Sequence, residues 1–292
     1  MCATCGCGND TVGVITVGRD GPADPGHEHG RDGPSHSHGP GHDHAPGHEH
    51  THEHGGADAP TRSPATETVS LEQRVLAKND HLAQHNREWL RARGIVALNM
   101  TSSPGAGKTS LLEQTIRALS DVPIAVIEGD QETVRDAERI AATGARAAQV
   151  NTGAGCHLDA DMTMRALHAL DPAPGTLLFI ENVGNLVCPA LFDLGEDRKV
   201  VMISVTEGTD KPLKYPHMFA AAGLVLVNKI DLLPYVDFDL GACTAYARAV
   251  NPGVEVLPVS VTAGEGLDRW YEWLADQRRA SATSLEGAGH PV

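Results

Sequence analysis

A glycine-rich octapeptide, SSPGAGKT at residues 102–109, has the residue types that bind nucleotide phosphates. It follows an apolar run and precedes a helical stretch, which is the setting that this chemistry needs. Glycines let backbone N–H groups turn toward phosphate oxygens, and the helix that follows adds its positive N-terminal end. Lys108 is expected to bind the β- and γ-phosphates and Thr109 to bind Mg²⁺, although Ser102 stands where the strict motif has glycine. The expected phosphate-binding residues are Ser103, Gly105, Ala106, Gly107, Lys108, Thr109 and Ser110.

A second motif, NKID at residues 228–231, matches the NKxD sequence with which GTPases read guanine. An aspartate carboxylate accepts hydrogen bonds from guanine N1–H and from the 2-amino group, and adenine offers neither donor. The motif follows an apolar run downstream of the phosphate loop, and a polar segment follows the next apolar run. The sequence therefore predicts GTP as the nucleotide, with its base bound by Asn228, Lys229, Asp231, Ser260 and Val261.

Two acidic motifs follow other predicted strands: EGD at residues 128–130 and ENVG at residues 181–184. We expect Asp130 and Glu181 to join Thr109 around Mg²⁺, and the Gly184 N–H to meet the γ-phosphate. Asp130 is the candidate for positioning the attacking water, so the expected catalytic residues are Lys108, Asp130 and Glu181. The alternative is that these acids cap helices or are merely solvated.

Three thiols within six residues open the chain: Cys2, Cys5 and Cys7. A short loop of this kind can wrap one ion, with the α-amino group as a fourth ligand. Such a donor set suits Ni²⁺ in square-planar geometry or Zn²⁺ in tetrahedral geometry. The alternative is a reduced tail without metal.

A second candidate metal set consists of Cys156, His157 and Cys188, for Ni²⁺ or Zn²⁺. Cys188 comes seven residues after Glu181, so one segment carries both an expected Mg²⁺ ligand and a thiol. Such a segment is what a nucleotide-gated metal site needs. Taken singly, each cysteine is also a common small core residue, and Cys243, inside a helical stretch, is predicted to be core.

Ten of the sixteen histidines form His-x-His pairs in a segment rich in Gly and Pro, about 18–60. Neutral imidazoles bind Ni²⁺ and Zn²⁺, and many weak sites on a flexible chain would make a metal store. A solubilising spacer is the alternative. The histidines are His27, His29, His36, His38, His42, His44, His48, His50, His52 and His54.

The net charge of −15 over 292 residues argues against partners such as nucleic acid or anionic membranes. No apolar run reaches the roughly 18 residues of a transmembrane helix, and residues 1–7 do not resemble a signal peptide. We therefore expect a cytoplasmic chain whose cysteines are thiols or metal ligands rather than disulfides.

Apolar runs that alternate with helical patterns must position these residues. Strands are predicted at 95–100, 123–127, 176–180, 200–205, 224–227 and 254–259. Helices are predicted from about 69 to 94 and at 109–119, 132–142, 158–170, 240–250 and 267–278. This alternation predicts an α/β fold, a doubly wound and mainly parallel sheet with ligands beyond the carboxyl ends of its strands. Residues 1–66 are predicted to be a disordered tail, 67–280 a nucleotide-binding domain, and 281–292 a flexible end.

Together these motifs resemble the HypB family of hydrogenase nickel-incorporation GTPases, over most of residues 69–278. The matching segments are SSPGAGKT at 102–109, EGDQ at 128–131, GCHL at 155–158, ENVGNLVCP at 181–189, TDKPLKYP at 209–216 and NKID at 228–231. The cysteine loop at residues 1–7 and the His-rich insert also resemble those of some family members.

The resemblance implies a P-loop GTPase of the SIMIBI class that forms a homodimer and acts as a nickel metallochaperone. It implies delivery of Ni²⁺ to the large-subunit precursor of [NiFe] hydrogenase, a HypA-type chaperone as partner, and a metal site of Cys156, His157 and Cys188 shared at the dimer interface. SIMIBI relatives carry an early P-loop lysine where this chain has Ser103 and Pro104. Any lysine acting in trans must come from elsewhere, with Lys211 or Lys214 as candidates.

Three other classes compete with this interpretation. A urease-type nickel GTPase shares both nucleotide motifs, but the Cys2, Cys5 and Cys7 loop and the spacing from Glu181 to Cys188 favour hydrogenase. A nickel or zinc storage protein on a nucleotide-binding scaffold would have no use for both Lys108 and Asp231. A translation or signalling GTPase would lack the cysteine clusters.

Overall fold

Short apolar runs form one sheet in the computed structural model, which describes residues 14–17, 64–130, 135–153 and 155–288. The sheet has eight strands in the order β1-β4-β3-β5-β2-β6-β7-β8. All neighbouring strands pair in parallel except β1, which is antiparallel to β4. The strands are β1 Val14–Val17, β2 Val96–Ser102, β3 Ile124–Asp130, β4 Arg146–Asn151, β5 Leu177–Glu181, β6 Arg198–Ser204, β7 Leu224–Asn228 and β8 Glu255–Pro258.

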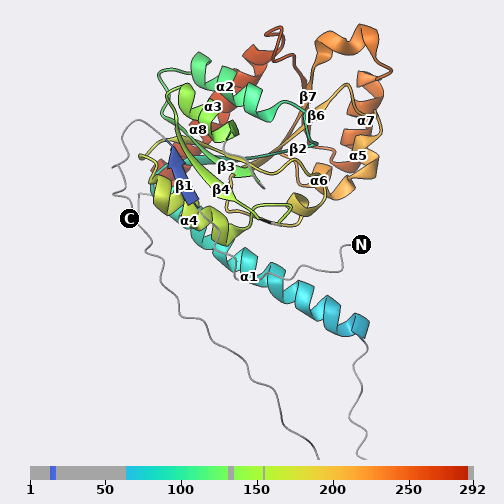
Figure 1. Cartoon of the computed structure of the whole chain (residues 1–292). Helices are drawn as coiled ribbons and strands as arrows, with labels where there is room; N and C mark the ends of the chain where they lie inside the picture. Colours follow the sequence, from blue (N-terminus) through green and yellow to red (C-terminus); the bar gives the residue numbers. More distant parts are fainter. Residues whose placement is uncertain (1–13, 18–63, 131–134, 154, 289–292) are drawn as a thin grey trace, which may run out of the picture. The chain divides into compact units, whose positions relative to one another are not determined.

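Helices cover both faces of this sheet (Figure 1). The α-helices are α1 Pro64–Ala92, α2 Lys108–Ala118, α3 Arg135–Ala142, α4 Ala160–Leu170, α5 Lys211–Lys214, α6 Pro216–Ala220, α7 Leu240–Val250 and α8 Leu267–Ala288. Two short 3₁₀ helices, η1 Cys188–Ala190 and η2 Ile230–Tyr235, follow β5 and β7. None of the helices in the described part of the chain is long and apolar enough to cross a membrane.

Alternate residues along each strand face different apolar clusters, as a pleated strand requires. Leu98 of β2 and Phe179 of β5 pack in one cluster with α2 and α8. Ala97 and Ile180, their strand neighbours, pack with α1 and α4 on the opposite face. Ile203 of β6 joins α6 and α7 in a third cluster. The prediction of a doubly wound, mainly parallel α/β sheet is therefore confirmed.

Two strands were not predicted. β4 lies between β3 and β1, and its central four residues are buried although two of them are alanines and one is a glutamine. β1 belongs to the segment 1–66 that was predicted to be disordered, and there that prediction fails: Val14–Val17 pair with β4, and Val14 contacts the α1–α4 cluster.

The chain divides into two compact units, residues 1–21 with 72–292 and residues 22–71. The whole sheet belongs to the first unit, and residues 64–71 of α1 are the described part of the second. Helix α8 continues to Ala288, past the predicted end of the folded domain at residue 280. The cysteine loop at residues 2–7 and the His-x-His tract lie outside the described residues.

Candidate nucleotide and metal site

The phosphate loop joins the end of β2 to the start of α2, in the strand–loop–helix order that the sequence predicted. Gly105 and Gly107 both have positive φ, +71° and +104°, which only glycine adopts without strain. The Lys108 Nζ donates a 2.7 Å hydrogen bond to the Oγ of Ser102. The serine in place of the usual first glycine thus holds the lysine that is expected to reach the phosphates.

A cavity of about 570 Å³ opens over this loop, at the carboxyl ends of β2, β3 and β5. It brings together most of the predicted phosphate and metal residues. Those that line it are Gly105, Ala106, Gly107, Lys108, Thr109, Ser110, Asp130, Glu181 and Gly184. The structure also places Glu128, Asp136 and Arg139 in its wall, none of which was assigned a role from sequence.

Two carboxylates meet at the floor of this cavity. Glu128 and Glu181 are opposite each other in the parallel pairing of β3 with β5, and both are buried. The Thr109 hydroxyl donates a 2.9 Å hydrogen bond to Glu181, and the Lys108 Nζ lies 3.9 Å from the same carboxylate oxygen.

Burial raises the pKa of both acids. Desolvation and the charge of Glu181 raise the pKa of Glu128 well above its usual range. Desolvation also raises the pKa of Glu181, while Lys108 opposes that rise. One oxygen of each carboxylate, the Oε2 atom, has no hydrogen-bond partner among the described residues. A divalent cation beside these oxygens would supply both charge and partner, so the residues present fit Mg²⁺.

The loop after β5 packs directly on the phosphate loop. A Cβ atom on Gly184 would lie 3.1 Å from the Cα of Pro104, so only glycine fits there without displacing backbone. This contact places the predicted γ-phosphate sensor against the phosphate loop itself.

The predicted base-binding residues gather on the other side of the phosphate loop. The Asn228 side chain donates to the Ala106 carbonyl (2.8 Å) and accepts from the Val261 N–H (3.2 Å). The Lys229 Nζ donates to the Gly105 carbonyl at 2.9 Å, and Lys229 has a left-handed backbone with φ of 65°.

A hydrogen bond from Ser260 orients the Asp231 carboxylate. The Ser260 hydroxyl donates to the Asp231 Oδ1 at 2.6 Å, and the Ala263 N–H donates to that hydroxyl at 3.1 Å. The NKxD motif and the segment after β8 therefore form one hydrogen-bonded unit, as their positions at strand ends suggested.

Cys156, His157 and Cys188 also come together. The two Sγ atoms are 2.9 Å apart, the Cys156 Sγ is 3.6 Å from the His157 Nδ1, and one ligand atom from each residue lies within 4.8 Å of the others. All three residues are half-buried. Cys156 follows β4 and Cys188 begins η1, so the set joins two distant segments.

The surroundings of this trio favour metal binding. Burial lowers the pKa of His157, which keeps the imidazole in the neutral form that ligates metals. The Phe192 ring packs against that ring, tilted by 35° with a centroid distance of 3.9 Å, and the Asn185 amide donates to the Cys156 carbonyl at 3.2 Å. By contrast, Cys243 is a core residue, as predicted, and burial raises its pKa to about 11.

Residues 96–258 match the family model described as CobW/HypB/UreG, nucleotide-binding domain. The hydrogenase maturation factor HypB of Escherichia coli is 57% identical over 78% of this chain and 80% of its own length. The HypB of Cupriavidus necator is 44% identical over 99% of this chain and 92% of its own length.

Among solved structures, HypB from Helicobacter pylori in complex with nickel has a TM-score of 0.66 and 36% sequence identity. The match covers 70% of this chain and 96% of that one. The chain therefore has a P-loop NTPase fold and belongs to the HypB family of hydrogenase maturation factors.

Proposed function

We propose that this chain is a GTP-hydrolysing nickel metallochaperone, which binds Ni²⁺ and delivers it to the large-subunit precursor of [NiFe] hydrogenase. The observation that carries the proposal is that one segment reaches both sites: Glu181 lines the nucleotide cavity, and Cys188 lies beside Cys156 and His157. A change at the γ-phosphate and a change at the metal are then changes in one piece of chain.

GTP is the proposed nucleotide because the NKxD motif lies against the phosphate loop with its aspartate oriented. Ser260 donates a hydrogen bond to Asp231, and Lys229 of the same motif contacts the Gly105 carbonyl. An aspartate carboxylate pairs with the N1–H and 2-amino donors of guanine. Adenine would leave that carboxylate without a hydrogen-bond partner, and a site built to hydrogen-bond its ligand discriminates strongly against a ligand that lacks the donors.

Hydrolysis is proposed to transfer the γ-phosphoryl group of GTP to water. The Lys108 ammonium stabilises the charge on the transferring group, and Asp130 positions the attacking water. Thr109, Asp130 and Glu181 would hold Mg²⁺, which when bound offsets the charge of the phosphate oxygens. Lys211 and Lys214 stay the candidates for a lysine acting in trans; here they pair with Glu207 (3.0 Å) and Asp210 (2.9 Å) on their own chain.

Nickel is the proposed cargo at Cys156, His157 and Cys188, because two thiolates and an imidazole suit Ni²⁺; Zn²⁺ accepts the same donors. The site is incomplete as one three-ligand set, which is consistent with a homodimer that shares the ion. The N-terminal cysteines would form a separate Ni²⁺ site and the histidine tract a store. A HypA-type chaperone is the proposed partner, and the cytoplasm the proposed location.

The alternative functions predict different responses of the segment from Glu181 to Cys188. A storage protein needs no nucleotide response in its metal site, whereas the proposed metallochaperone does. A urease-type nickel GTPase would show the same response and would differ in the precursor that receives the metal.

Site-resolved thiol protection tests this proposal on the full chain. Free Ni²⁺ is set with a chelating buffer, and alkylation of Cys156 and Cys188 by iodoacetamide is quantified on their peptides by mass spectrometry. Peptide resolution keeps the tail cysteines from masking the result. Half-protection should need a Ni²⁺ concentration that differs about 5- to 150-fold between GDP and a non-hydrolysable GTP analogue. Equal protection in both states would refute nucleotide-gated release.

A further inference from the structure

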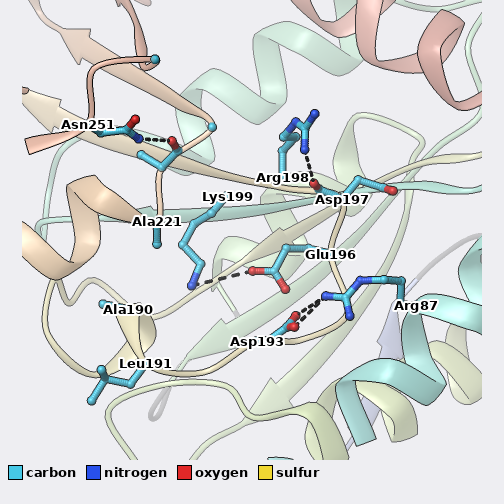
Figure 2. Close-up of a pocket in the computed structure, with 13 residues that line it drawn as sticks. Arg87, Ala190, Leu191, Asp193, Glu196, Asp197, Arg198, Lys199, Ala221 and Asn251 are labelled. Carbon is cyan, nitrogen blue, oxygen red and sulfur yellow. Dashed lines mark hydrogen bonds and ion pairs between the residues drawn. The ribbon is translucent and has the colours of Figure 1, made fainter. Parts of the chain in front are cut away.

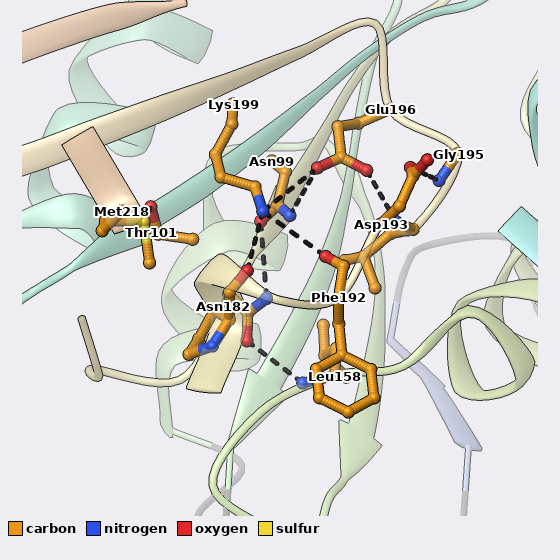
Figure 3. A network of polar contacts seen from close by, with 12 residues as sticks. Asn99, Thr101, Leu158, Asn182, Phe192, Asp193, Gly195, Glu196, Lys199 and Met218 are labelled. Atoms are coloured by element: carbon orange, nitrogen blue, oxygen red, sulfur yellow. Dashed lines mark hydrogen bonds and ion pairs between the residues drawn. The ribbon is translucent and has the colours of Figure 1, made fainter. Parts of the chain in front are cut away.

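A lysine is buried at the start of β6, outside the nucleotide cavity. Lys199 is 7% exposed. Its Nζ donates to the Pro189 carbonyl at 2.7 Å and to the Phe192 carbonyl at 3.4 Å, and lies 3.8 Å from the Glu196 Oε1 (Figure 3). A buried ammonium is costly unless it is paired and hydrogen-bonded, so these contacts are what keeps it there.

Its partner, Glu196, is held as firmly. The Asn99 amide donates to the Glu196 Oε1 at 2.9 Å, and the Leu194 N–H donates to the Oε2 at 2.7 Å. Asn99 and Lys199 are themselves opposite each other in the pairing of β2 with β6. The charge pair is therefore anchored to the central sheet.

The two carbonyls that Lys199 contacts belong to residues next to the candidate metal site. Pro189 follows Cys188 directly in η1. Phe192 is the residue whose ring packs against His157, with a centroid distance of 3.9 Å. One ammonium thus contacts the turn that carries a thiol ligand and the residue that backs the imidazole ligand.

The same network reaches the nucleotide side. Asn182, the residue after Glu181, donates to the Asn99 Oδ1 at 3.4 Å. The Asn182 Oδ1 accepts from the Leu158 N–H at 3.1 Å, directly after His157 (Figure 3). The strand end that bears the nucleotide-facing acid is therefore bonded directly to the segment of Cys156 and His157, and through Asn99 to Glu196, the partner of Lys199.

A second ion pair, between Arg87 and Asp193, holds the same loop and does not involve the Pro189 or Phe192 carbonyl. Arg87 of α1 contacts Asp193 at 2.6 Å, and both line a cavity of about 630 Å³ together with Glu196 and Lys199 (Figure 2). Figure 2 shows the two pairs side by side, Arg87 with Asp193 and Lys199 with Glu196. The Arg87 pair is the natural control for any general loosening of the loop.

We infer that Lys199 is a positioning residue for the metal site: paired with Glu196, its ammonium holds the Cys188 turn and Phe192 at the spacing that lets Cys156, His157 and Cys188 share one Ni²⁺. This inference rests on the proposed metal site. Outer residues that orient ligands in this way are worth about 10- to 100-fold in metal affinity.

The test uses the full chain and nickel sulfate alone, with free Ni²⁺ set by a chelating buffer. Lys199→Met leaves Glu196 as an unpaired buried charge and is expected to unfold at lower temperature. The double variant Lys199→Met with Glu196→Gln removes both charges. Its amide oxygen can accept from the Asn99 amide or from the Leu194 N–H but not from both, so this variant is also expected to lose some stability, which the melting temperature reports. It is compared with Arg87→Leu and with the wild type.

Three readouts separate positioning from folding: Ni²⁺ protection of Cys156 and Cys188 from alkylation, the melting temperature, and GDP affinity. The double variant should need at least about tenfold more free Ni²⁺ for half-protection, with GDP affinity unchanged. Arg87→Leu should stay within about twofold of the wild type in protection. Protection within twofold of the wild type in the double variant, or an equal loss in Arg87→Leu, would overturn the role of Lys199. No protection in the wild type itself would instead refute the metal site.

Discussion

Replacing Gly107 by alanine tests whether the phosphate loop and the NKxD motif are packed as one unit. Gly107 has a φ of +104°, and a Cβ atom there would lie 2.6 Å from the Asn228 Nδ2. That contact is too short, so the Asn228 amide must move. Moving it breaks the hydrogen bonds to the Ala106 carbonyl and from the Val261 N–H.

The expected cost has two parts. The left-handed backbone of a non-glycine residue costs roughly 1–2 kcal/mol, and each lost hydrogen bond about 0.5–1.5 kcal/mol. Gly107→Ala should therefore lower the free energy of unfolding by about 2–5 kcal/mol. Gly144 is a matched control, since it has a φ of +93° and a Cβ atom there would meet no heavy atom within 4 Å beyond its chain neighbours. Gly144→Ala should lose only the backbone part, about 1–2 kcal/mol.

Urea unfolding of the nucleotide-free chain measures both variants, and titration with a fluorescent GDP measures the site. Gly107→Ala should bind GDP at least about tenfold more weakly, since 1.4 kcal/mol is a factor of ten, whereas Gly144→Ala should bind it normally. If the two variants lose the same stability and both keep GDP affinity, the contact between Gly107 and Asn228 does not organise the site.

Three further outcomes follow from the site and the tail. Asp231→Asn should weaken GTP binding and favour xanthine nucleotide, because the new amide donates where guanine N1–H also donates; a competition titration reads this directly. Glu128→Gln should stabilise the magnesium-free chain more at pH 8 than at pH 5. The folded-state pKa of Glu128 is raised, so the stability of its neutral form is lost as pH rises through that pKa; urea midpoints at both pH values test it. Deleting residues 18–60 should remove most bound Ni²⁺ but leave the tight Cys2 site, which elemental analysis would show.

The motifs that could be located from the sequence are those whose geometry depends mainly on residues adjacent in the chain. The phosphate loop and NKxD each sit between a strand and a helical turn, and a single chain segment supplies most of their geometry. Their juxtaposition through Asn228 was foreseeable, because parallel strands end at one edge of a sheet. The individual hydrogen bonds to Ala106 and Val261 were not.

Elements defined by their neighbours escaped prediction. The segment RAAQVN of β4 has little β-branched or aromatic content, and its identity as a strand comes from pairing with β3 and β1. β1 is four residues in the segment 1–66, which was predicted to be disordered from its composition as a whole; pairing with β4 and the contact of Val14 with the α1–α4 cluster stabilise it. The composition of the whole segment predicted disorder, and four residues are too few to change that average.

Roles that depend on register were also missed. The sequence shows the acids of EGD and ENVG, and we assigned the first role to Asp130. The pairing of Glu128 with Glu181 arises from the alignment of β3 with β5, which no local pattern encodes. Lys199 at the start of a strand looks like an exposed charge until the loop from residue 188 folds over it.

In the proposed function, the loop between β5 and β6 would carry the communication between the two sites. Its ends are fixed to the same central strand, because Glu181 pairs with Met100 and Lys199 with Asn99. If loss of the γ-phosphate moves Glu181, the two paired ends limit how far the strands can separate, and residues 182–198, where Cys188 lies, would take up the change. Linkage then makes the effect reciprocal: if the nucleotide state changes Ni²⁺ affinity, Ni²⁺ changes the relative affinity for GTP and GDP by the same factor. In this proposal the coupling depends on the paired ends of the loop rather than on the length of chain from Glu181 to Cys188.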